Sequence, residues 1–161
     1  MTIALYPGSF DPITYGHLDI ATRSAAVFDE VVIGVFDTPQ KNLLFTTEER
    51  VNLIKKAIEG IPNLRVDSYT VMTVDFARQL GAKVIVRGLR MSPDFEHEFE
   101  MALMNKKQAP EIEVLCMMTS VQYQFLSSSL MKEAARYGGY IEDLVPKHVA
   151  NALRKKLYVK Q

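Results

Sequence analysis

Apolar and polar residues follow two patterns along this chain: short apolar runs, and longer segments with apolar residues three or four apart. The short runs are typical of strands, and the longer segments have the period of amphipathic helices. Because the two alternate and the runs look apolar enough to be covered on both faces, we expect a Rossmann-like α/β fold with a doubly wound, parallel sheet. The five expected strands are residues 2–6, 30–36, 64–68, 83–86 and 113–117.

Several expected helices have recognisable ends. Thr46 and Glu49 have the spacing of a capping box, and residues 92–94 offer a serine cap, an N1 proline and an acid. The glycine pair 138–139 ends another helix, and a last one follows Pro146 to about Leu157. With no linker or repeat in sight, residues 1–161 are expected to form a single domain.

Composition narrows the function classes. The chain has 161 residues, 48% of them apolar, and its 19 Lys and Arg balance 19 Asp and Glu. This size supports one core, and the zero net charge argues against a nucleic-acid coat or a membrane-surface binder. There is no N-terminal targeting segment or apolar stretch of about twenty residues, so we expect the mature protein to start at Met1.

The single cysteine points to a reducing compartment. Cys116 lies in an apolar run, has no partner for an internal disulfide, and is expected to be a buried small hydrophobe. His17, His97 and His148 are scattered, so no zinc-ligand spacing is present and no protein metal site is expected. We expect a cytoplasmic protein.

The unusual residue clusters follow the expected strands. Ligands of open parallel sheets bind beyond the carboxyl ends of the strands, and residues 7–17, 37–41, 87–90 and 123–129 lie there. Neither G-x-x-x-x-G-K-[ST] nor G-x-G-x-x-G occurs, so a nucleotide would be held in another way.

His17 follows Gly16 at the expected start of a helix capped by Thr14. A helix N-terminus favours an anion and disfavours imidazolium, so His17 would act as a neutral N–H donor; it could equally be only a capping residue. Ser9 and Phe10 lie in a turn that could present a hydroxyl and an N–H to an anion, although an ordinary turn serine fits as well.

Three cationic side chains could bind phosphate. Arg87 and Arg90 bracket Gly88 directly after a strand, which suits two phosphate-binding forks. A surface ion pair is the alternative, and phosphate binding is favoured because Gly88 permits close approach of a ligand. Lys41 lies in a loop after a proline and carries little weight alone.

Two further segments could complete a pocket. After Ser92, an apolar stripe is expected to be core and comprises Phe95, Phe99, Ala102 and Leu103. A neighbouring face could border a partly apolar pocket or be a solvated flank, and comprises Asp94, Glu98, Met101 and Asn105. The serine run 127–129 precedes a helix and would form a second anion site, with Tyr123 and Phe125 lining a planar base or packing in the core.

At this point the sequence resembles the phosphopantetheine adenylyltransferase family, in the nucleotidyltransferase superfamily with a T/H-x-G-H motif. The resemblance covers nearly the whole chain. It is carried by residues 6–12, 14–17, Lys41, 45–46, 48–50, 87–90, 94–96, Glu98 and 127–133. T-x-G-H alone marks the superfamily, whereas the arginine pair with Lys41 and the serine run points to this branch.

The resemblance implies transfer of AMP from ATP to 4′-phosphopantetheine, giving dephospho-coenzyme A and pyrophosphate, without a general base. The implied catalytic residues are His17, Lys41 and Arg90. Phosphopantetheine would contact Ser9, Lys41, Thr73, Arg87, Met101 and Asn105. ATP would contact Ser9, Phe10, His17, Gly88, Leu89, Arg90, Glu98, Tyr123, Gln124, Phe125, Leu126, Ser127, Ser128 and Ser129. Mg²⁺ held mainly by ATP phosphates, feedback by coenzyme A and a homohexamer are also implied.

Four positions depart from the commonest family pattern: Ser9, Tyr15, Thr73 and Tyr123. Ser9 keeps the hydroxyl of the frequent threonine, whereas Thr73 replaces a larger apolar residue and could contact substrate through either side chain or backbone. Two rivals stay open. One is a relative acting on nicotinamide mononucleotide or an alcohol phosphate, and the other is a nucleotide sensor without turnover.

Overall fold

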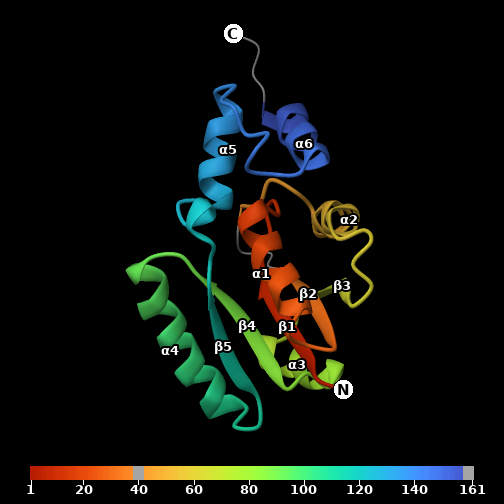
Figure 1. Cartoon of the computed structure of the whole chain (residues 1–161), viewed down its shortest axis with the longest axis vertical. Helices are drawn as coiled ribbons and strands as arrows, with labels where there is room; N and C mark the ends of the chain where they lie inside the picture. Colours follow the sequence, from red (N-terminus) through yellow and green to blue (C-terminus); the bar gives the residue numbers. More distant parts are fainter. Residues whose placement is uncertain (38–41, 158–161) are drawn as a thin grey trace.

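The computed structural model describes residues 1–37 and 42–157 and places five parallel strands in one sheet (Figure 1). The strand order is β3-β2-β1-β4-β5, and every neighbouring pair is parallel. This confirms the expected Rossmann-like α/β class. The strands are β1 (Ile3–Gly8), β2 (Glu30–Phe36), β3 (Leu64–Tyr69), β4 (Val84–Leu89) and β5 (Glu113–Met118).

Helices cover both faces of the sheet. They are α1 (Tyr15–Ala25), α2 (Thr47–Ala57), α3 (Thr73–Leu80), α4 (Ser92–Gln108), α5 (Ser128–Arg136) and α6 (Lys147–Leu157), with a 3₁₀ turn η1 (Val121–Tyr123). Among the described residues, none of the helices is long and apolar enough to cross a membrane.

Alternating side chains of the strands divide the core into two parts. On one face Ile33 packs in a cluster with Ile20 of α1, Ile54 of α2 and Leu153 of α6. On the other face Val32, the next residue before Ile33, belongs to a cluster with residues of α3. The alternation follows from the two-residue period of a strand, and it fixes α1 and α3 on opposite faces.

Most expected boundaries are close, with two corrections. The strands β1 and β4 both continue past their expected ends. In β4, Gly88 and Leu89 still pair with β5, so Arg87 and Gly88 belong to a strand rather than to a loop. The cap of α4 is Met91, not Ser92: its backbone is extended and its carbonyl accepts the N–H of Asp94.

The expectation that all five strands are covered on both faces is wrong for the two outer ones. β3 and β5 have exposed positions along their length, and Cys116 of β5 is exposed rather than buried. An outer strand has a neighbour on one side only, and Figure 1 shows α4 beside β5 at this edge. The apolar run around Cys116 therefore does not indicate burial.

The expected core stripe of α4 is also wrong. Phe95, Phe99 and Leu103 are 57%, 55% and 58% exposed. The helix lies at the edge of the sheet, where no further layer formed by residues 1–37 and 42–157 covers it. Together the exposed apolar residues form what we call the α4–β5 surface: Phe95, Phe99, Met101, Leu103, Met104, Leu115 and Met118.

Candidate active site

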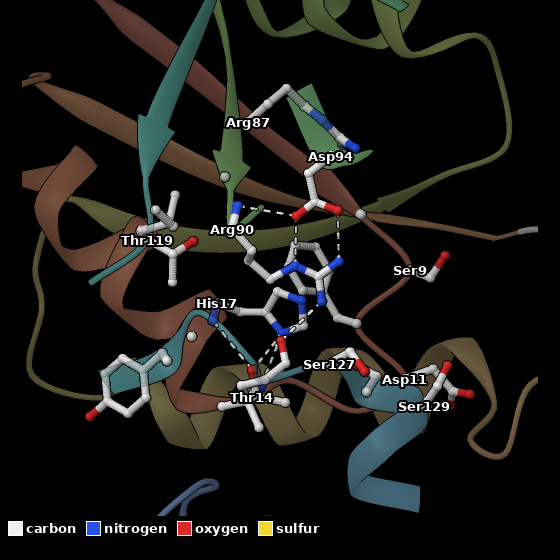
Figure 2. Close-up of a pocket in the computed structure, with 18 of the residues that line it drawn as sticks. Ser9, Asp11, Thr14, His17, Arg87, Arg90, Asp94, Thr119, Ser127 and Ser129 are labelled. Atoms are coloured by element: carbon white, nitrogen blue, oxygen red, sulfur yellow. Dashed lines mark hydrogen bonds and ion pairs between the residues drawn. The ribbon is translucent and has the colours of Figure 1, made fainter. Parts of the chain in front are cut away.

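A pocket of about 600 Å³ opens at the carboxyl ends of β1, β4 and β5 (Figure 2). Its walls come from the loop after β1, the first turn of α1, the β4–α4 connection and the start of α5. This is the edge at which the sequence places its clusters. The lining residues are 6–11, Thr14, Gly16, His17, Ile20, Asn42, Leu43, Arg87, Gly88, Arg90, Asp94, Glu98, Thr119, Tyr123, 126–129 and Lys132.

His17 is fixed by the cap of its own helix. Thr14 is the N-cap of α1, as expected, and its side chain accepts the N–H of His17 at 3.4 Å. The backbone N–H of Thr14 donates to Nδ1 of His17 at 3.1 Å, which completes a capping box. Because a backbone N–H can only donate, Nδ1 is an acceptor and the neutral ring carries its hydrogen on Nε2.

The surroundings of His17 keep the ring neutral. Burial, and to a smaller extent the positive charges of Arg90 and Arg87, together lower the pKa of His17 from 6.5 to about 4. Phe10 meets the ring edge to face, with centroids 5.1 Å apart. His17 is therefore a neutral N–H donor near neutral pH, in agreement with the interpretation from its place at a helix N-terminus.

Arg87 at the end of β4 is held by a buried carboxylate. Its Nε and Nη2 donate to the two oxygens of Glu98, both at 2.7 Å, and its Nη1 donates to the carbonyl of Pro7 at 2.8 Å. Such a bidentate pair fixes the plane of the guanidinium. The ion pair that we left open for Arg87 is therefore present, and it lies in the pocket wall.

Arg90, in the connection between β4 and α4, makes a similar ion pair with Asp94, which lies one turn before Glu98 on α4. Its Nε and Nη2 donate to Asp94 at 2.8 and 3.0 Å, and its Nη1 donates to the carbonyl of Leu126 at 3.0 Å. Figure 2 shows the guanidinium between Asp94 and His17. Arg90 thereby connects the β4 edge to the segment that leads into α5.

The start of α5 is the second helix N-terminus at the pocket. Ser127 is its N-cap and accepts the N–H of Leu130 at 3.1 Å. Ser128 donates to the carbonyl of Pro12 at 2.7 Å. The first N–H groups of a helix lack partners within it, so this terminus and that of α1 suit oxyanions.

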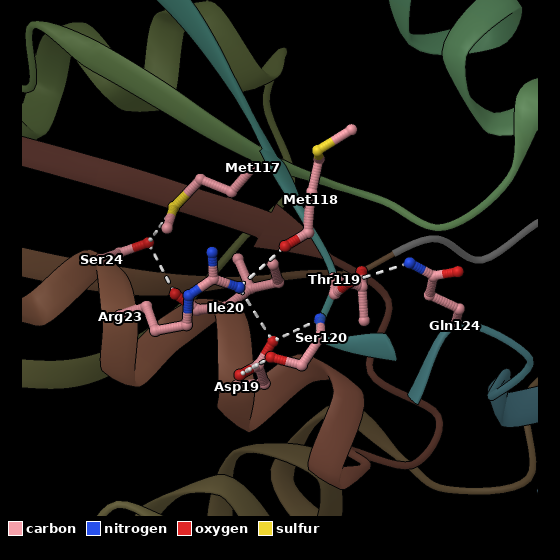
Figure 3. A network of polar contacts seen from close by, with 9 residues as sticks. All are labelled: Asp19, Ile20, Arg23, Ser24, Met117, Met118, Thr119, Ser120 and Gln124. Atoms are coloured by element: carbon pink, nitrogen blue, oxygen red, sulfur yellow. Dashed lines mark hydrogen bonds and ion pairs between the residues drawn. The ribbon is translucent and has the colours of Figure 1, made fainter. Parts of the chain in front are cut away.

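A polar network anchors the segment between β5 and α5 to α1 (Figure 3). Asp19, two residues after His17 in α1, accepts hydrogen bonds from both the N–H and the hydroxyl of Ser120, at 3.0 and 2.8 Å. Arg23 donates to Asp19 at 3.1 Å and to the carbonyl of Met118 at 2.8 Å. The helix that presents His17 thus also fixes the chain that leads to Tyr123.

The structure brings most expected site residues together. Those that line the pocket are Ser9, Phe10, His17, Arg87, Gly88, Arg90, Glu98, Tyr123, Leu126, Ser127, Ser128 and Ser129. Those outside its lining are Thr73, Leu89, Met101, Asn105, Gln124 and Phe125. Of these, Thr73 begins α3 and its hydroxyl lies 3.0 Å from that of Tyr69. Lys41 lies outside the described residues.

Sequence reasoning gave no role to two charged groups of the wall, Asp11 and Lys132, which form an ion pair at 2.8 Å. The proline-flanked turn that contains Asp11 was the available signal. Arg50 was likewise only part of the resemblance. It is 1% exposed and donates to the carbonyls of Ser9 and Phe36 at 2.7 and 3.0 Å.

The arrangement suits a polyanion with several phosphates. Two helix N-termini, two planar guanidinium groups and a neutral imidazole donor face one cavity, and such donors stabilise charge on phosphoryl oxygens. In residues 1–37 and 42–157, no three His, Cys, Asp or Glu side chains are grouped as a metal ion would require.

Comparison with known proteins agrees with this site. The sequence model of the cytidylyltransferase-like family matches residues 5–134. The chain is 53% identical over 156 residues to the phosphopantetheine adenylyltransferase of Desulforudis audaxviator, covering 97% of this chain and 96% of that protein. It is 52% identical over 156 residues to the protein of the same name from Clostridium tetani, covering 97% and 98%.

A solved structure shares the fold. It is a Vibrio parahaemolyticus protein described as a nicotinate-nucleotide adenylyltransferase, with a TM-score of 0.74, 20% identity, and coverage of 96% of this chain and 99% of that one. That likeness concerns the fold alone. With near-complete coverage at about half identity to curated relatives, the chain belongs to the phosphopantetheine adenylyltransferase family.

Proposed function

We propose that this protein transfers AMP from ATP to 4′-phosphopantetheine and releases dephospho-coenzyme A and pyrophosphate. The observation that carries the proposal is the convergence of neutral His17 with the carboxylate-held Arg87 and Arg90 in one pocket. The names of the relatives supply the acceptor, and the geometry supplies a site for two phosphate-bearing substrates.

The reaction is a substitution at the α-phosphorus of ATP. A phosphate oxygen of phosphopantetheine forms the new P–O bond, and the bond from the α-phosphorus to the leaving pyrophosphate breaks. The attacking phosphate is largely dianionic at neutral pH because its second pKa is about 6, so no side chain has to remove a proton. The protein has to align the two phosphates and stabilise the charge that develops on them.

The residues divide between the two phosphate groups. His17 donates from Nε2 to the α-phosphate as charge builds on it, and Arg90 holds the β- and γ-phosphates at the start of α5. Arg87 and Ser9 hold the phosphate of phosphopantetheine. Lys41, which the structure does not describe, would bridge the attacking phosphate and the α-phosphate.

The outer contacts follow the resemblance. Glu98 and residues 123–129 would hold the adenosine and phosphates of ATP. Thr73, Met101 and Asn105, which lie outside the pocket lining, would border the pantetheine arm.

Magnesium fits this site as a partner of the nucleotide. Each of the described carboxylates of the wall already forms an ion pair with a cationic side chain; these carboxylates are Asp11, Asp94 and Glu98. Mg²⁺ would therefore be held chiefly by ATP phosphates and would neutralise part of their charge.

We further propose that copies of the chain associate, as the expected homohexamer. The α4–β5 surface supports this, because several exposed apolar side chains on one helix and the strand beside it favour association. Light scattering after size exclusion would give the mass, and Phe99→Glu should shift it to that of a smaller species. A monomeric wild type would contradict the proposal.

Coenzyme A contains both the pantetheine arm and the adenylate, so it would compete with both substrates and provide feedback. Competition kinetics with added coenzyme A test this. The cytoplasmic location expected from the lone cysteine stays a prediction.

The decisive experiment is pyrophosphate release from Mg-ATP, with 4′-phosphopantetheine or nicotinamide mononucleotide as acceptor. Release with phosphopantetheine alone supports the proposal. Release with the mononucleotide alone would keep adenylyl transfer but overturn the assignment of Arg87. Silence with both, while ATP still binds, would favour a sensor.

A further inference from the structure

Asp11 is a buried carboxylate that joins three separate parts of the chain. It lies in the loop after β1, is 3% exposed, and accepts three hydrogen bonds. The backbone N–H of Leu44 donates to Oδ2 and that of Phe45 to Oδ1, both at 2.9 Å. The ammonium of Lys132 on α5 donates to Oδ2 at 2.8 Å.

The contact with α5 extends over one turn of the helix. Ser128, four residues before Lys132, donates its hydroxyl to the carbonyl of Pro12, the residue after Asp11. Side chains four apart lie on the same face of a helix, so this face of α5 is docked on residues 11–12. The docking sets where the N-terminus of α5 lies relative to the loop after β1.

Each part joined by Asp11 contributes to the pocket. Ser9 lies two residues before it, Asn42 and Leu43 directly precede Leu44, and the serine run begins α5. Arg50 supports the same loop through the carbonyl of Ser9. The walls expected to hold the two reacting phosphates are therefore connected by one side chain.

We propose that Asp11 is a positioning residue that sets the spacing between the acceptor-phosphate wall and the triphosphate wall. This inference rests on the proposed function. A carboxylate is needed because the donors approach both of its oxygens, and asparagine would present an NH₂ group to one of them. The nucleotide binds through many groups, whereas in-line attack depends on the spacing of two of them.

Lys132 has two possible roles that the proposal separates. In the structure its ammonium is engaged by Asp11, and we assign it the role of holding α5 through that carboxylate. The alternative is that it binds phosphate directly, since it also lines the pocket. The two roles give different double-variant results, because groups acting through one contact are not additive.

The test compares Asp11→Asn, Lys132→Met and the double variant with wild type. Asp29→Asn is the matched control. Asp29 also accepts a backbone N–H, from Thr2 at 2.6 Å, and lies 3.9 Å from the terminal ammonium, but it precedes β2 at the opposite end of the sheet. The readouts are kcat for pyrophosphate release, the dissociation constant of ATP, the melting temperature, and hydrogen exchange at Leu44 and Phe45.

We expect Asp11→Asn to lower kcat about tenfold or more at a temperature where it is fully folded, while ATP affinity changes less than about threefold. Exchange at Leu44 and Phe45 should accelerate. Lys132→Met should lower kcat less, and the double variant should match Asp11→Asn. Asp29→Asn should keep the wild-type kcat.

A kcat within about twofold of wild type in folded Asp11→Asn would overturn the inference. The inference would also be overturned if the decrease in kcat equals the fraction of Asp11→Asn that is unfolded. Additive losses in the double variant would overturn the role assigned to Lys132 and indicate direct phosphate binding. If wild type releases no pyrophosphate with phosphopantetheine, the proposed function fails; pyrophosphate binding and the exchange data then test Asp11, and unchanged values in Asp11→Asn would overturn its positioning role.

Discussion

The backbone N–H of Thr14 donates to Nδ1 of His17 at 3.1 Å, so the ring that caps α1 also has its remaining hydrogen on Nε2. In most capping boxes a Glu or Gln at the third helical position accepts this bond. A histidine there does the same and leaves a neutral donor on its other nitrogen. The capping role and the catalytic role that sequence reasoning set against each other are therefore compatible in His17.

Two substitutions separate these roles. His17→Gln keeps a cap acceptor and an N–H donor, whereas His17→Glu keeps the cap and has no donor. We expect kcat to fall by about 10²- to 10³-fold in His17→Glu, as for loss of one transition-state donor, and by less in His17→Gln. Steady-state kinetics and ATP titration check this. Equal, small losses in both would remove His17 from the chemistry.

The lowered pKa of His17 makes a pH prediction. Between about 6.5 and about 4 the unfolded chain takes up a proton that the folded ring does not, so this group makes folding less favourable as the pH falls. Above pH 6.5 its contribution is constant. NMR titration of the ring should give a midpoint near 4, and His17→Gln should lose this part of the pH dependence of unfolding. A midpoint near 6.5 would contradict it.

Asp19 should affect ATP more than the acceptor. Its pKa is lowered, because the bonds from Ser120 and Arg23 outweigh the effect of burial. Asp19→Asn weakens the anchoring of the segment that leads to Tyr123. We expect the KM for ATP to rise about tenfold and the KM for phosphopantetheine to stay within about twofold. Arg65→Met, which removes an exposed ion pair with Glu30 outside this network, is the control, and equal changes in both KM values would contradict the assignment.

Arg50 should matter mainly for stability. Its guanidinium bonds the carbonyls of Ser9 and Phe36 and the hydroxyl of Thr47, the last at 2.9 Å. Arg50→Met leaves these carbonyls unpaired in a buried site and should lower the free energy of unfolding by about 2–4 kcal/mol. Urea denaturation measures it. Arg65→Met, which removes an exposed pair with Glu30, should cost under about 1 kcal/mol.

Local features could be predicted from the sequence. Thr14 and Thr46 cap their helices as predicted, because a cap depends on the few residues that follow it, whereas α4 is capped by Met91 and not by Ser92. The sheet class follows from alternation of strands and helices. The convergence of Arg87, His17 and the serine run follows in turn, because parallel strands end at the same edge.

Features that depend on residues far apart in the sequence could not be predicted. Asp11 and Lys132 are 121 positions apart, and no local pattern pairs them. Phe99 and Cys116 show a related limit of prediction from sequence. An apolar pattern indicates that one face of an element is hydrophobic, and it does not indicate which part of this chain or of another molecule covers that face. Within the part of the chain that the structure describes, no layer covers the β5 edge, and both side chains are exposed.

The pairing of Arg87 and Arg90 with two carboxylates of one helix has a consequence for selectivity. Glu98 and Asp94 lie one turn apart on α4 and occupy both guanidinium groups. An incoming anion has to compete with a carboxylate that is already in place. A lone inorganic phosphate gains few contacts from that exchange, whereas a substrate with a base or a long arm brings binding energy from elsewhere. The abundant small anions of a cell are therefore poor competitors for this site.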